Sequence, residues 1–186
     1  MIEKLLKFID PFLSYIDSGK LFRKPFSWLY VLMAVVNALI PFYAIYKVID
    51  TGILSYGGGK VIFAFFLVWL FLVAACWVGV QIWWNRKDKV LETSAEGSEF
   101  PITPVISHCI QTFGEWIGCF IAIFGFGISL IGPIFLGEAT SFLPMMNYGF
   151  LGIILFPIFG FLYIVFMRFI AEMFRALASI ANNTKK

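Results

Sequence analysis

The chain has 186 residues, of which 61% are hydrophobic and 13% are charged, and its mean hydropathy is +0.90. A soluble domain carries about 25% charged residues, so this composition excludes an ordinary soluble fold, because lipid or partner helices must cover the apolar surface. The formal net charge of +3 does not predict a nucleic-acid partner, since the basic residues lie near the ends of apolar segments, where membrane topology explains them.

Residues 1–25 come before the first segment that is long enough to span a bilayer. Apolar side chains recur there at helical spacing between charged ones, which predicts an amphipathic interfacial segment interrupted at Pro11. Its lysines are expected to face anionic head groups, and docking beneath the membrane helices is the alternative.

Four apolar segments follow, and each has the roughly 20 helical residues that cross a hydrocarbon core. They are Phe26–Val48, Val61–Trp84, Phe113–Leu136 and Tyr148–Arg168. We therefore expect an all-α membrane protein, a four-transmembrane-helix bundle with hairpins at residues 26–84 and 105–186, the second ending in a cytoplasmic helical tail. The polar stretch 85–104 predicts a cytoplasmic linker, because Pro101 and Pro104 stop a helix before the third segment.

Lysine and arginine are unevenly distributed between the two sides of these segments. Twelve of them fall before the first segment, after the second, or at the end of the fourth and beyond it. Only Lys47 and Lys60 fall on the other side. Because basic loops stay in the cytoplasm, this imbalance predicts that both termini are cytoplasmic.

Polar side chains concentrate where the third and fourth segments meet the cytoplasmic side. They form a candidate polar cluster of His108, Gln111, Glu115, Arg168, Glu172 and Arg175. Ionisable groups are costly in lipid, so we expect Glu115 to pair with Arg168, directly or through Glu172. A structural clamp is the favoured interpretation, and a gate or a head-group site is the alternative. His108 and Glu115 share a helix face, so they could relay a proton or bind a cation, but a wet interfacial turn is the simpler interpretation.

Small residues recur in the third segment, where Gly114, Gly118 and Ala122 repeat every four positions. This spacing lets helix backbones approach closely, so we expect a central helix or a contact between chains, with the glycines of the fourth segment as one possible partner.

Asn37 precedes Pro41 by four residues in the first segment. Its amide is expected either to cap the carbonyl group that the proline leaves unpaired or to bond to another helix.

The run Arg168-Phe-Ile-Ala-Glu172, with Ile180-Ala-Asn-Asn183 after it, resembles the end of a family of small bacterial membrane proteins that carry a domain of unknown function. The opening Lys7-Phe-Ile-Asp-Pro11 resembles the start of the same family. The chain departs from that pattern at Ser179, where a second arginine is expected, and in having four spans where the family typically has two. The resemblance implies a bacterial cytoplasmic (inner) membrane setting and no established activity.

Three classes of function compete. The sequence has no serine elbow, no His-Glu-x-x-His motif and no paired aspartates, so we expect no enzyme, no catalytic residues, no cofactor and no metal. The favoured interpretation is a non-enzymatic membrane subunit or assembly scaffold, whose partners are the lipid bilayer and other membrane subunits or further copies of itself. The alternative is a homo-oligomeric small ion channel or transporter, in which Asn37, Gln81 and the region from Glu115 to Arg168 line a path. Against it, the centres of the spans carry almost no charge.

Overall fold

The computed structural model describes residues 20–52, 58–92, 102–135 and 144–184, together with Pro11 and Ser55. Its elements, in order, are α3 (Lys20–Asp50), α5 (Gly58–Arg86), α6 (Lys89–Glu92), α7 (Ile102–Phe135), the 3-10 helix η2 (Pro144–Leu151) and α8 (Gly152–Asn183). The amphipathic segment predicted over residues 1–25 lies largely outside the described residues. Four helices are long and apolar enough to cross a membrane. The chain is an all-α, multi-pass membrane protein with four transmembrane helices, and the fold class predicted from the sequence is confirmed.

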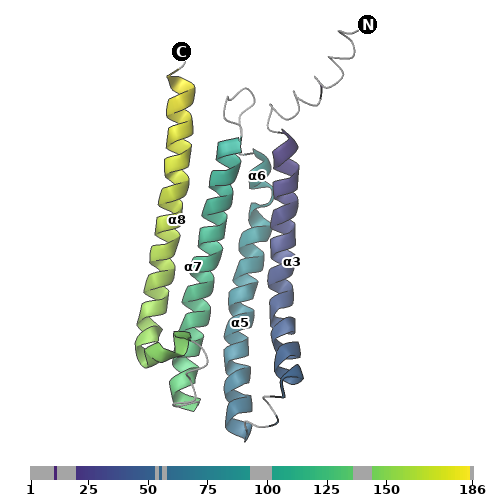
Figure 1. The fold of residues 1–186 in the computed structure, drawn as a ribbon, viewed down its shortest axis with the longest axis vertical. Coiled ribbons are helices and arrows are strands. Elements are labelled where there is room, and N and C mark those ends of the chain that lie inside the picture. The colour runs from purple at the N-terminus through teal and green to yellow at the C-terminus, as the bar shows by residue number, and fades with distance from the viewer. Residues whose placement is uncertain are drawn as a thin grey trace.

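The four long helices stand side by side in the order α3, α5, α7, α8 (Figure 1). Each helix packs against the one before it, and α8 packs chiefly against α7. The result is an up-and-down bundle that is flattened into one layer. The start of α3, the end of α5, the start of α7 and the end of α8 all lie at the same end of this layer (Figure 1).

That end carries α6 and most of the charge, and we call it the basic end. Its basic residues include Lys24, Arg86, Lys87, Lys89, Arg168 and Arg175, whereas Lys47 and Lys60 lie near the opposite ends of α3 and α5. The described chain thus enters α3 and leaves α8 at one end, as an even number of crossings requires. That this end faces the cytoplasm stays a prediction.

The helices α7 and α8 are longer than a bilayer is thick. They have 34 and 32 residues, which at 1.5 Å per residue give about 50 Å against a hydrocarbon core of about 30 Å. The helices also extend into the linker predicted at residues 85–104, because α5 continues to Arg86, α6 follows, and α7 begins before Pro104. That proline lies in the first turn of α7, where its missing N–H group interrupts no helical hydrogen bond.

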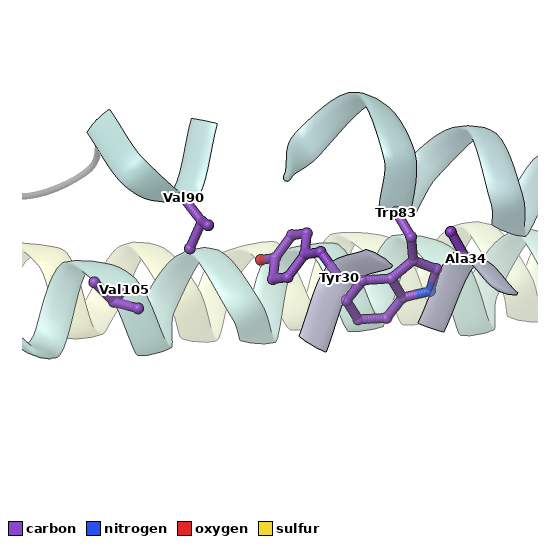
Figure 2. Close-up of a cluster of buried hydrophobic side chains, with 5 residues drawn as sticks. All are labelled: Tyr30, Ala34, Trp83, Val90 and Val105. Atoms are coloured by element: carbon purple, nitrogen blue, oxygen red, sulfur yellow. The ribbon is translucent and has the colours of Figure 1, made fainter. Parts of the chain in front are cut away.

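The interior of the bundle is narrow, and most large apolar side chains point outward along the helices, as expected for surfaces that lipid covers. The main cluster of large buried side chains lies at the basic end, where α3, α5, α6 and α7 meet. It consists of Tyr30, Ala34, Trp83, Val90 and Val105 (Figure 2). The rings of Tyr30 and Trp83 meet edge to face with centroids 4.9 Å apart, a favoured aromatic geometry.

The contact between α7 and α8 is built from small residues. A Cβ atom added at Gly118 would lie 2.6 Å from the carbonyl oxygen of Gly160, and one added at Gly160 would lie 2.8 Å from the Cβ atom of Ala122. A Cβ atom added at Gly114 would likewise collide with the side chain of Met167. Small residues thus let α7 and α8 lie close together, and α7 lies between α5 and α8.

Candidate functional site

Glu115 is the one charged residue that α7 holds, and it faces both neighbouring helices at the edge of the membrane. The 20 residues from Trp116 to Phe135 carry no charge and, as helix, cover about 30 Å, the full thickness of a hydrocarbon core. Glu115 therefore lies where α7 leaves the apolar region toward the basic end. Its exposed fraction is 7%, so the carboxylate is shielded by protein and must find its partners there.

Three helices supply those partners. The Oε1 atom of Glu115 accepts hydrogen bonds from Arg168 Nε at 2.8 Å and from Gln111 Nε2 at 3.0 Å, and Arg168 Nη2 lies 2.7 Å away. The Oε2 atom pairs with Arg86 Nη2 from α5. Arg175 extends the network, because its Nη2 donates to Gln111 Oε1 at 3.1 Å. Two arginines thus contact the carboxylate and a third is linked to it through Gln111, so this ion cluster keeps an excess of positive charge.

The predicted pairing of Glu115 with Arg168 is present and direct. Glu172, the predicted intermediary, is exposed on α8 and forms no ion pair with any other described residue. Arg86 was missed as a partner, although its position offered a signal. In an antiparallel hairpin, the end of the second span lies beside the start of the third, so a basic residue that closes the second span is a natural partner for Glu115.

His108 belongs to a second network, which faces α3. Its Nδ1 atom shares a hydrogen bond of 2.8 Å with the Tyr30 hydroxyl, which also donates to Thr112 Oγ1 at 3.2 Å. Within the described part of the chain, no hydrogen bond joins His108 to Glu115, because the two side chains lie against different helices. The hypothesis of a relay between them therefore gains no support. Nor do three or more His, Cys, Asp or Glu side chains gather into a metal-binding group among the described residues.

Asn37 joins α3 to α7 one level deeper in the membrane. Its Oδ1 atom accepts a hydrogen bond from Trp116 Nε1 of α7 at 2.8 Å, and its Nδ2 atom donates to the Met33 carbonyl at 2.8 Å. Gly79 of α5 leaves the space for this contact, since a Cβ atom there would lie 2.8 Å from Trp116 Nε1. Of the two expectations for Asn37, the bond to another helix is the one that is found.

The ion cluster can clamp α5, α7 and α8, and its surplus of arginine suits it to contact an anion. Its members come from helix positions fixed by close packing, so the charges hold their places without a loop. Comparisons of the chain with protein families, with curated proteins and with solved structures find no match.

Proposed function

We propose that this chain is a non-enzymatic, integral membrane subunit or assembly scaffold of a larger membrane complex. The observation that carries the proposal is the flattened bundle, in which α8 packs chiefly against α7. An edge helix held by one neighbour leaves the rest of its circumference to lipid or to helices of other chains.

The outer surface of α8 is suited to such contacts. Its exposed residues include Ile154, Ile158, Phe161, Leu162, Val165 and Phe169. Large apolar side chains of this kind pack against lipid chains and against partner helices alike. The scaffold proposal assigns part of this surface to partner helices.

The internal polar groups also support a structural role. Asn37 bonds to Trp116, Tyr30 bonds to His108, and Glu115 is held by two arginines, so these side chains are used in joining helices. A solute pathway needs polar groups that remain open to the passing solute. Polar side chains that bond to one another within the bundle are typical of a rigid scaffold.

Native purification in a mild detergent, followed by mass determination, tests the proposal. A scaffold subunit should elute with a fixed set of other membrane proteins, at a mass well above that of the 21.1 kDa chain. Recovery of a single 21.1 kDa chain with lipid alone, from the native membrane and in several mild detergents, would contradict it.

A homo-oligomeric channel or transporter is the second candidate, and the exposed amide of Gln81 favours it. This side chain lies within the uncharged part of α5 and points out of the bundle, where a second copy could share a polar path with it. Purified protein in liposomes should then pass ions, and Gln81→Leu should abolish the flux. Silent liposomes, with a fixed partner set in the native membrane, would reject the channel in favour of the scaffold.

A further inference from the structure

A groove between α5 and α7 opens at the basic end, beside the ion cluster. It encloses about 290 Å³ and is bordered by Glu115 on one side and by successive turns of α5 and the start of α6 on the other. This groove lies at the membrane edge, because Glu115 directly precedes the 20 uncharged residues of α7 that cover a hydrocarbon core.

The lining changes from apolar to charged along the groove. Val78, Ile82 and the amide of Gln81 lie at the level of the uncharged part of α5, and Asn85, Arg86 and Lys89 follow toward the basic end. A phospholipid has the same order of chemistry, with acyl chains below and a phosphate group at the membrane surface. The order of the lining residues along the membrane normal therefore matches that of a phospholipid, and their charge is opposite to that of its phosphate.

The polar end of the groove offers hydrogen-bond donors to a ligand. A guanidinium group carries five N–H donors, and the ion pair of Arg86 with Glu115 uses Nη2. Lys89 is exposed and has no ion pair with any described residue, and Asn85 is likewise exposed. Glu115 borders the groove as well, but Arg168 and Arg86 already compensate its charge. Asp88 directly precedes Lys89 but lines a different groove, beside α3, and Glu92 lies one turn beyond Lys89; neither carboxylate lines this groove.

We propose that this groove binds one anionic phospholipid, with its phosphate held by Arg86, Asn85 and Lys89 and its acyl chains lying along Val78 and Ile82. Lysine and arginine side chains at a membrane surface attract anionic lipids, and a guanidinium matches the geometry of a phosphate. This inference goes beyond the proposed function and does not depend on it, because it concerns the isolated chain.

Native mass spectrometry of the full chain in mild detergent, titrated with phosphatidylglycerol or phosphatidylcholine, tests the proposal. We expect phosphatidylglycerol to bind more tightly than phosphatidylcholine. Lys89→Gln should weaken phosphatidylglycerol binding about fivefold, which corresponds to about 1 kcal/mol for one basic residue near the surface. Asn85→Leu should weaken it at least about twofold without any change in charge, because it removes a hydrogen-bond donor from the phosphate.

Lys87→Gln is the matched control. It removes the same charge at the same end of the molecule, but the Lys87 ammonium group stacks on Trp84 at 3.6 Å and lines a different groove, beside α3. It should leave binding unchanged, and an equal loss in Lys87→Gln and Lys89→Gln would show diffuse surface attraction and overturn the proposal. So would wild-type affinity in Lys89→Gln. Displacement of the lipid by millimolar inorganic phosphate would identify a free anion as the ligand and also overturn it.

Discussion

The replacement Glu115→Gln tests whether the ion cluster holds α5, α7 and α8 together. It leaves Arg86 and Arg168 without their counter-ion. The side chains of Arg86 and Glu115 are 21% and 10% exposed, and removing one partner of a largely buried pair costs about 3–5 kcal/mol. The side chain of Arg168 is 51% exposed, so solvent screens its pair, which contributes at most about 1 kcal/mol.

Two effects reduce the loss below the full figure for a buried pair. Glutamine keeps the shape of the side chain and still accepts a hydrogen bond, and Arg86 can extend its head group toward the water at the basic end. We therefore expect Glu115→Gln to lower the free energy of unfolding by about 2 kcal/mol. Glu172→Gln is the matched control, because it removes the same charge from an exposed position that has no ion pair among the described residues, and it should change stability by less than about 0.5 kcal/mol.

Reversible unfolding in mixed micelles, with SDS as denaturant and circular dichroism as readout, gives these free energies. Double-mutant cycles then separate the two ion pairs, and the coupling of Glu115 with Arg86 should exceed its coupling with Arg168, because burial reduces screening. A loss in Glu115→Gln no larger than that in Glu172→Gln would refute the clamp. A stronger coupling with Arg168 would refute the ranking by burial.

Three further substitutions test the helix contacts by the same assay. Gly118→Ala should destabilise the fold by about 1–3 kcal/mol, because its Cβ atom collides with α8, whereas Gly59→Ala, with no atom within 4 Å, should cause no loss. Asn37→Leu should cost about 1 kcal/mol by removing the acceptor of the Trp116 indole, whereas Gln81→Leu at an exposed position should cost nothing; equal effects would contradict the assignment. Tyr30→Phe keeps the packed ring but removes the hydroxyl that bonds to the His108 ring, so about 1 kcal/mol should be lost, and wild-type stability would show that this bond contributes nothing.

The number of spans could be predicted from the sequence, because a bilayer imposes a fixed length on any helix that crosses it. The contact of Glu115 with Arg168 was also predictable. Both residues border uncharged stretches on the same side, and a charge at that depth needs a partner. The flattening of the bundle was not predictable, since apolar side chains that face lipid look like those that face another helix.

It was harder to predict which neighbouring helix each polar residue of α7 would contact. His108, Gln111 and Glu115 lie at three- and four-residue steps, which places them broadly on one side of α7. That side is divided between three neighbours, so His108 meets α3, Gln111 meets α8, and Glu115 meets both α5 and α8. Helical periodicity predicts which face of a helix a side chain lies on. It does not predict which neighbouring helix that face meets, because this depends on how the helices are arranged.

Arg86 belongs both to the ion cluster and to the α5–α7 groove, so stability and lipid binding are linked through it. In Glu115→Gln, Arg86 loses its counter-ion, so its uncompensated positive charge attracts a phosphate group in the groove more strongly. The variant should therefore unfold more easily than the wild type in phosphatidylcholine micelles and yet bind phosphatidylglycerol more tightly. A ligand that binds the folded state stabilises it by RT ln(1 + [L]/Kd), so added phosphatidylglycerol should narrow the stability difference between the two proteins. A difference that stays the same in both lipids would mean that Arg86 serves the clamp alone and that the phosphate lies elsewhere.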